Sequence, residues 1–200
     1  MTTEHFTLQG ARGAAIAEST SRASMFVGAV SAGLVALGLI ATATHISTVF
    51  YAFGLILLST LSFVGFVTLE RVLQSGLEDL GYAERIAQLR TFYFDSAPQL
   101  SHYLSRVPPA ERLASQGLFR GYRQLFRTLA GLVGVVTAVL TGSAAGMLAT
   151  IASGYSGLAG FITGGVVGVA VLVILTRFQH AAWERALQNQ PFNEEDSSAS

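Results

Sequence analysis

The chain has 200 residues, of which 51% are hydrophobic and only 12% are charged. That length is enough for one domain, and the composition is too apolar for an ordinary soluble one. The formal net charge is zero, which removes any global electrostatic argument for nucleic-acid binding. Because the chain has no cysteine, disulfides, thiolate nucleophiles and zinc-thiolate sites are excluded.

Two long stretches, residues 23–69 and residues 128–176, contain no Asp, Glu, Lys or Arg. An α-helix rises about 1.5 Å per residue and the hydrocarbon core of a bilayer is about 30 Å thick, so each stretch can hold two spans and a tight turn. We therefore predict an all-α polytopic membrane protein with four transmembrane helices arranged as two hairpins. The predicted helices cover about residues 23–44, 49–69, 128–151 and 157–176.

Residues 1–22 are predicted to be a cytoplasmic amino-terminal tail and amphipathic lead. Residues 41–43 have the A-x-A form of a signal-peptidase site. However, the lead carries Glu4 and Glu18, and the apolar run after it exceeds the roughly 7 to 15 residues of a signal-peptide core. We expect the first helix to be retained.

Orientation follows from arginine, because basic residues near the ends of spans stay on the cytoplasmic side. All twelve basic residues are arginines, and all fall on one side of a four-span arrangement. An even number of spans with both termini cytoplasmic is therefore predicted. The use of arginine without lysine, with abundant alanine and glycine, indicates a GC-rich bacterial source, and hence a bacterial plasma (inner) membrane.

Residues 70–127 are predicted to form a cytoplasmic antiparallel helical hairpin between the two transmembrane hairpins. Apolar residues recur mostly three or four positions apart from residue 69 to Tyr93, which indicates a helix with one apolar stripe. It is expected to end near Asp95, before a short helix opened by Pro98. Residues 110–127 then return toward the bilayer. The residues that mark this predicted interaction segment are Arg90, Tyr93, Asp95, Pro98 and Tyr103.

Part of this segment resembles a known group of proteins. The sequence LERVLQ at residues 69–74, the sequence IAQLRTFYFDSAP at residues 86–98, and Tyr103-Leu104 are similar to a segment of uncharacterised four-pass membrane proteins of actinobacteria. There, too, the segment lies between two hydrophobic hairpins. The resemblance implies the topology but no activity or functional residue. Topology alone also resembles two-span effector modules of bacterial nucleotide-signalled defence systems.

Residues at the ends of the second hairpin are suited to the headgroup level of the membrane. Three arginines approach the third span at helical spacing and would gain about 1 kcal/mol each from anionic lipid, although they equally serve as the topology signal. Residues 177–200 form the cytoplasmic tail, read as disordered from about residue 192. The predicted headgroup and topology residues are Arg120, Arg123, Arg127, Arg177 and Trp183.

Small residues recur at a spacing of four in three of the predicted spans. Such faces let helix backbones approach closely and gain dispersion contacts. The pattern does not decide whether the face meets a helix of the same chain or of a second copy. The predicted helix-packing residues are Gly160, Gly164, Gly168, Gly142, Gly146, Gly28 and Ala32.

Polar residues near the spans offer little chemistry. Thr137 and Thr141 share a helix face and could line a polar path, but such hydroxyls usually bond to the carbonyl one turn back. Ser156 lies in a G-x-S-G sequence like that of intramembrane proteases, without a histidine base suitably placed. His180 and Glu184 are four apart, and two ligands do not make a metal site. We predict no catalytic, cofactor-binding or metal-binding residues.

The sequence thus predicts a non-enzymatic integral membrane protein, with a four-helix bundle in the bilayer. It is expected to act by self-association or by docking a partner through its helical cytoplasmic segment. The expected partners are the lipid bilayer, further copies of the chain and a cytoplasmic protein, with no nucleic acid and no cofactor. The alternative is an oligomeric pore-forming, channel-like or membrane-perturbing effector.

Overall fold

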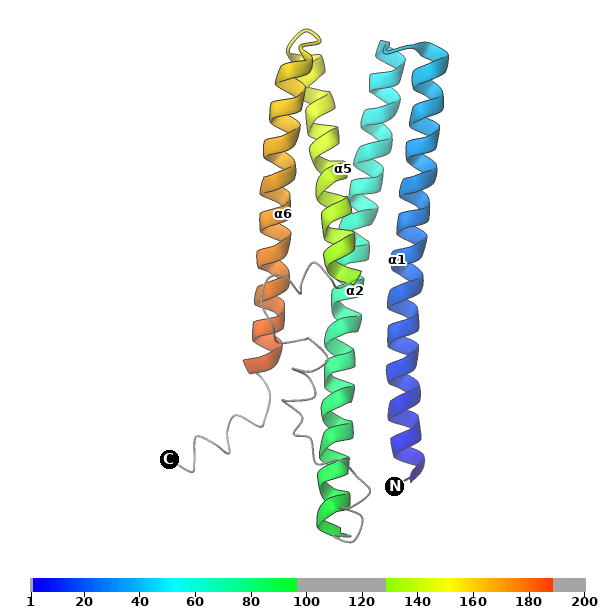
Figure 1. The fold of residues 1–200 in the computed structure, drawn as a ribbon, viewed down its shortest axis with the longest axis vertical. Helices are drawn as coiled ribbons and strands as arrows, with labels where there is room; N and C mark the ends of the chain where they lie inside the picture. Colours follow the sequence, from blue (N-terminus) through cyan, green and yellow to red (C-terminus); the bar gives the residue numbers. More distant parts are fainter. Residues whose placement is uncertain (1, 97–128, 189–200) are drawn as a thin grey trace.

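A computed structural model describes residues 2–96 and 129–188 of the chain (Figure 1). These residues form four helices and no strand: α1 (Thr2–Thr44), α2 (Thr48–Ser96), α5 (Leu129–Ala152) and α6 (Gly157–Gln188). Each helix contains a stretch long and apolar enough to cross a membrane. The prediction of an all-α chain with four long apolar helices is therefore confirmed for the described residues.

Three of the helices continue well beyond the predicted spans. The lead and the first apolar run form one helix, α1, of 43 residues, while α2 has 49 residues and α6 runs on to Gln188. Since proline breaks a helix by removing a backbone donor and clashing with the preceding turn, such lengths require proline-free sequence. The four prolines, Pro98, Pro108, Pro109 and Pro191, all lie outside these helices.

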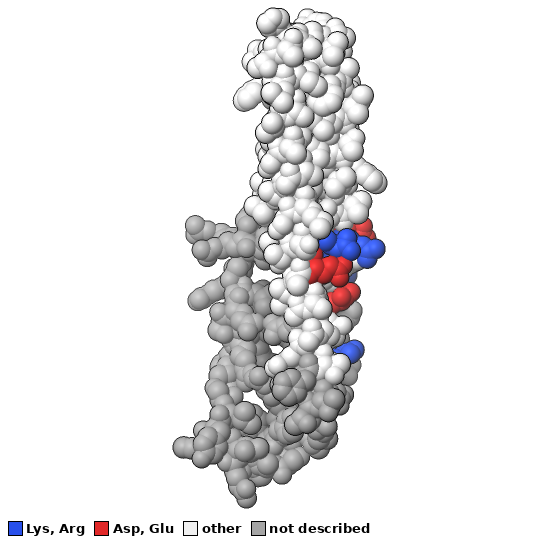
Figure 2. Space-filling view, turned by 90° about the vertical axis from the view of Figure 1, so that its right-hand side faces the viewer, with Lys and Arg blue, Asp and Glu red and all other residues white. Residues whose placement is uncertain are grey.

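Charge divides the molecule into two halves. On the face seen in Figure 2, charged side chains of the described residues begin near mid-height, and the upper half carries none. The uncharged parts of the four helices have 20 to 24 residues each, which corresponds to about 30 to 36 Å. That length matches the hydrocarbon core of a bilayer, so the uncharged half is the part suited to the membrane.

The four helices form an open row in the order α1, α2, α5, α6 (Figure 1). α2 packs against α1 on one side and α5 on the other, and α5 packs against α6, whereas contacts between next-but-one helices are sparse. The predicted four-helix bundle thus takes the form of a row in the described residues. α1 and α6 lie at its two ends, and apolar side chains of α6 face outward.

The core lies where α1, α2 and α5 meet. Phe26, Leu58, Leu69 and Val133 are buried there, each at most 3% exposed. Gly65 of α2 makes this approach possible: a Cβ at this position would lie 3.0 Å from the Phe26 ring and would overlap the Thr137 hydroxyl. The absence of a side chain at Gly65 thus lets three helices pack in one layer.

The connection between α5 and α6 ends α5 in a Schellman motif. The amide of Tyr155 donates to the carbonyl of Thr150 (2.8 Å) and the amide of Gly154 donates to that of Ile151 (3.3 Å). Gly154 has φ of 68°, a left-handed conformation that glycine adopts without steric cost. Gly154 is therefore required by the turn itself, which accounts for part of the G-x-S-G sequence.

We expect Gly154→Ala to destabilise the protein by about 1 kcal/mol, the usual cost of a left-handed L-residue. Gly157→Ala is the matched control, because Gly157 has no positive φ and an added Cβ there meets no atom within 4 Å. The measurement is the midpoint of detergent-induced unfolding followed by circular dichroism. Equal midpoints for the two variants would contradict the role assigned to Gly154.

Aromatic side chains connect the two turns at the uncharged end of the molecule. The rings of Tyr51 and Tyr155 lie 5.5 Å apart in a tilted arrangement, and the Tyr155 hydroxyl lies 3.5 Å from that of Thr48. Phe50 packs edge-on against Tyr51. Tyrosine favours membrane-water interfaces because one end of its side chain is apolar and the other is wet. This cluster thus marks the second boundary of the uncharged half.

Candidate functional site

Glycines spaced four residues apart form a close backbone contact between α5 and α6, the α5–α6 seam. A Cβ at Gly142 would lie 2.6 Å from the carbonyl oxygen of Gly164, and a Cβ at Gly146 would lie 2.7 Å from that of Gly160. Gly168 faces Gly142 and Ala138, with nearest atoms at 3.7 and 3.4 Å. The structure therefore brings together the five predicted packing glycines of α5 and α6 within one chain.

An apolar groove of about 580 Å³ runs along one side of this seam. Its α5 wall includes Val139 and Ser143, and its α6 wall includes Phe161, Gly165 and Val169. The groove lies wholly within the uncharged half, and no charged side chain lines it. We refer to it as the α5–α6 groove.

The predicted packing residues of α1 are placed differently. Gly28 and Ala32 are exposed, and an added Cβ at Gly28 would meet no atom within 4 Å. α1 instead approaches α2 through Gly33, where a Cβ would lie 2.9 Å from Leu61 Cδ1. Gly54 and Gly65 of α2 are likewise in close contact with neighbouring helices. Gly54, Leu58, Leu61 and Gly65 follow one another at intervals of four, three and four residues. This helical spacing was a signal of the contact that the sequence analysis missed.

Several hydroxyl groups of the spans bond to their own helix. Thr137 donates to the carbonyl of Val133 (2.7 Å), Thr141 to that of Thr137 (2.8 Å), and Ser62 to that of Leu58 (2.7 Å). Because these donors are used within the helix, the groups do not require water. This arrangement favours the packing interpretation of the hydroxyl faces over a polar path.

We expect Thr137→Val to leave stability within about 1 kcal/mol of the original, because valine has the same shape and the lost bond is a local one. Thr137 is fully buried and touches Gly65, so the larger Thr137→Leu is the comparison expected to disrupt packing. Unfolding midpoints in detergent measure both. A large loss for Thr137→Val alone would show that the hydroxyl has a further role.

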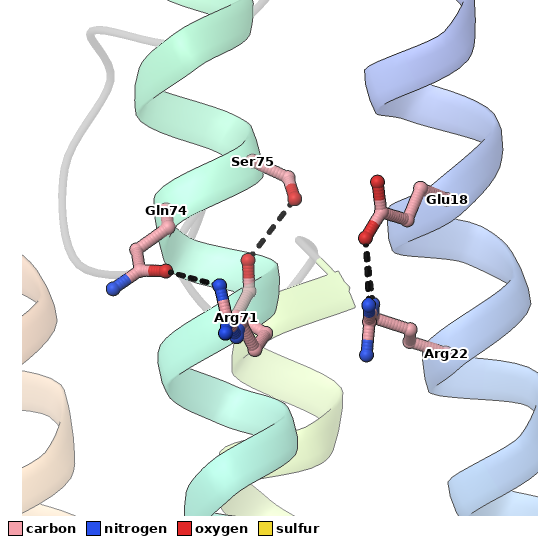
Figure 3. Close-up of polar contacts among 5 residues, drawn as sticks. All are labelled: Glu18, Arg22, Arg71, Gln74 and Ser75. Atoms are coloured by element: carbon pink, nitrogen blue, oxygen red, sulfur yellow. Dashed lines mark hydrogen bonds and ion pairs between the residues drawn. The ribbon is translucent and has the colours of Figure 1, made fainter.

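The charged boundary of the uncharged half is shown in Figure 3. On α1, Arg22 pairs with Glu18 at 2.8 Å. On α2, the guanidinium of Arg71 donates to the side-chain oxygen of Gln74 (3.4 Å), and Ser75 donates to the carbonyl of Arg71 (3.1 Å). Arg177 is exposed on α6. Exposed pairs of this kind contribute little to stability. These residues show where along the helices the uncharged half ends.

Gln179 is the largest fully buried side chain among the described residues, with 1% of its surface exposed. Its amide nitrogen lies 3.1 Å from the position that a Cβ would take on Gly134 of α5. Four residues on, the Trp183 ring lies 3.5 Å from the corresponding position on Gly76 of α2. Gln179 was not singled out from the sequence, whereas Trp183 was predicted at the headgroup level, and its ring contacts α2. Gly134 and Gly76 were the available signal.

Groups that could hold a metal ion are sparse. The Nε2 atom of His180 lies 3.0 Å from a carboxylate oxygen of Glu184 one turn away. No cluster of three or more His, Asp or Glu side chains suited to a metal occurs in the described parts of the chain. The pair by itself is a surface contact on α6.

The predicted interaction segment is described only in part. Arg90, Tyr93 and Asp95 belong to the last turns of α2, which ends at Ser96. The remaining predicted residues of this region, Pro98, Tyr103, Arg120, Arg123 and Arg127, lie outside the described residues.

Comparisons with known proteins give no match, so the function is inferred from the structural observations above. No protein-family model matches the chain, and no curated protein or solved structure matches it. The four apolar helices, their common uncharged length and the one-sided charge of the described residues indicate a helical membrane protein.

Proposed function

We propose that this chain is a non-enzymatic, four-span protein of a bacterial plasma membrane, with both termini in the cytoplasm. Its helices form two transmembrane hairpins, and it acts by associating with further copies of itself or with a cytoplasmic protein through the helical segment between them. No nucleic acid and no cofactor take part.

The continuity of α1 and α2 past the charged boundary carries this proposal. Beyond Arg22 and Glu70 the two helices continue for 20 and 26 residues, or roughly 30 and 40 Å, in the same direction (Figure 1). A chain that only filled space in the bilayer would not need this length. Rigid helices that project from a membrane are suited to presenting a contact surface to another protein.

The open row supports association more than a pore within one copy. The row formed by the described helices has no enclosed lumen, and the hydroxyls of Thr137, Thr141 and Thr150 in α5 bond within the helix. The alternative, a channel-like or membrane-perturbing effector, requires several copies to close around a lumen. The two edge helices of the row, α1 and α6, each have a close neighbour on one side only. Further copies can pack there, so experiment must test this arrangement.

Reconstitution of the full chain in planar bilayers and in liposomes tests the proposal. We expect oligomers by mass measurement, with no unitary conductance from the same preparation. Reproducible unitary conductance would favour the pore. A chain that is monomeric at every protein-to-lipid ratio, and that recruits no cytoplasmic protein to the liposomes, would contradict the proposal.

A further inference from the structure

We propose that Ser75 and Gly76 form a hinge in α2, and that the Trp183 ring of α6 fixes the angle of this hinge. The hinge lies just past the charged boundary, so it sets the direction of residues 71–96, which we call the α2 extension. This device goes beyond the proposed function, because it governs how the extension is held and not what it binds.

α2 has a weak point at residues 75–76. Glycine lowers the stability of a helix relative to alanine, because its backbone loses more conformational freedom on folding. The Ser75 hydroxyl donates to the carbonyl of Arg71 one turn back (3.1 Å; Figure 3), a bond that often bends helices. Sharp bends in helices occur preferentially at glycine and serine pairs. These two residues are therefore a point at which the 49-residue helix α2 bends readily.

The weak point lies beyond the packed core. α2 packs between α1 and α5 in the uncharged half, where Leu69 is buried. α5 begins at Leu129, and α2 continues past that end (Figure 1). Residues 75–76 follow Leu69 by six and seven positions, or about 10 Å along the axis. A bend there would turn the α2 extension without disturbing the core.

Trp183 contacts α2 at this weak point. Its ring atoms Cζ2 and Cη2 lie 3.5 and 3.8 Å from the position that a Cβ would take on Gly76. α1 packs on the side of α2 opposite to α5 and α6 (Figure 1), so bending toward α6 is the direction that remains for the ring to oppose. Bending in that direction would force the backbone of Gly76 into the ring. The ring therefore holds the hinge at one angle.

α6 keeps the ring in place independently of α2. Gln179, one turn earlier on the same face of α6, is 1% exposed and packs beside Gly134 of α5. The α5–α6 seam then fixes the rest of α6 through backbone contacts. By contrast, contacts between α2 and α6 are sparse, and Trp183 is only partly buried. The ring can thus leave Gly76 while the uncharged half stays packed, which frees the α2 extension to bend.

Distances between two spin labels in the full chain, reconstituted in liposomes, test this hinge. The labels are attached to cysteines introduced by Ile174→Cys on α6 and Arg85→Cys on the α2 extension, both at exposed positions. We expect one narrow distance distribution when the rest of the chain is unchanged. Trp183→Ala should widen this distribution at least twofold, because the ring no longer opposes bending.

Gly76→Ala separates a hinge from a general loss of packing. Alanine stabilises a helix relative to glycine, so adding Gly76→Ala to Trp183→Ala should restore the narrow distribution. Gly81→Ala is the matched control, because Gly81 lies in the same extension but an added Cβ there meets no atom within 4 Å. Added to Trp183→Ala, it should leave the distribution wide.

Phe178→Ala is the control for the loss of an aromatic side chain, because Phe178 is 50% exposed on the same helix. It should keep the narrow distribution. An unchanged distribution for Trp183→Ala, or equal widening by Phe178→Ala, would show that Trp183 does not fix the angle. If Gly76→Ala does not restore the narrow distribution, or Gly81→Ala restores it equally well, the hinge is not at residues 75–76. Any of these results overturns the proposal.

Discussion

Replacing Gly164 with leucine is expected to prevent α5 from packing on α6 and to lower the free energy of unfolding by more than about 3 kcal/mol. A Cβ at this position would lie 2.8 Å from the carbonyl oxygen of Gly142 and 3.2 Å from the Cα of Gly146. These are backbone atoms, which cannot rotate away as a side chain can. Forcing even modest extra volume into a packed interior costs about 1 to 3 kcal/mol, and leucine adds four carbon atoms here.

The adjacent residue provides the control for this prediction. Gly165 is one position away in the same helix, but an added Cβ there meets no atom within 4 Å. Gly165→Leu should therefore keep the unfolding midpoint of the original in detergent titrations followed by circular dichroism. If Gly164→Leu and Gly165→Leu unfold at the same midpoint, the seam does not hold the two helices as described.

The second large effect is expected at Gln179, where Gln179→Glu should destabilise the protein by about 3 kcal/mol at pH 8. The two side chains have the same shape, so the change introduces a charge without a change of volume. Gln179 is 1% exposed and packs against Gly134 and its surroundings. Removing an unpaired carboxylate from water costs several kcal/mol even after the protein relaxes.

Gln74→Glu is the matched control, because it makes the same substitution on the exposed face of α2, beside Arg71. There the carboxylate stays in water next to a guanidinium, so stability should change by less than about 0.5 kcal/mol. Detergent unfolding of both variants at the same pH gives the comparison. A similar loss of stability for Gln179→Glu and Gln74→Glu would mean that the Gln179 side chain is not enclosed.

Charge and spacing in the sequence were enough to predict the main features of the described fold. Each of the two uncharged stretches is long enough for two membrane-spanning helices, so together they indicated four apolar helices. The four-residue spacing of Gly142 and Gly146, and of Gly160 and Gly164, indicated close approach. Such patterns are local to one helix, so they could be recognised without knowing which helices are neighbours.

What could not be predicted depends on which helices meet. Gly28 and Ala32 have the same spacing as the seam glycines, yet they face outward, because spacing within one helix does not specify a partner. For the same reason, the spacing could not show that the four helices lie in a row. Gln179 follows Arg177 and was therefore read as lying past the membrane, although Gly134 of α5 leaves room for it.

Cysteine accessibility tests directly whether four helices cross the membrane with all described charge on one side. The chain has no cysteine, so a single introduced cysteine is the only position in the protein that a thiol reagent can label. Ile46→Cys and Ser153→Cys probe the two turns, and Glu18→Cys and Glu78→Cys probe the charged half; all four positions are exposed.

In intact bacterial cells that express each variant, a membrane-impermeant thiol reagent should label residues 46 and 153 and leave residues 18 and 78 unlabelled. After permeabilisation all four should react. Labelling of residue 18 or 78 in intact cells, or protection of residue 46 or 153, would contradict the four-span arrangement.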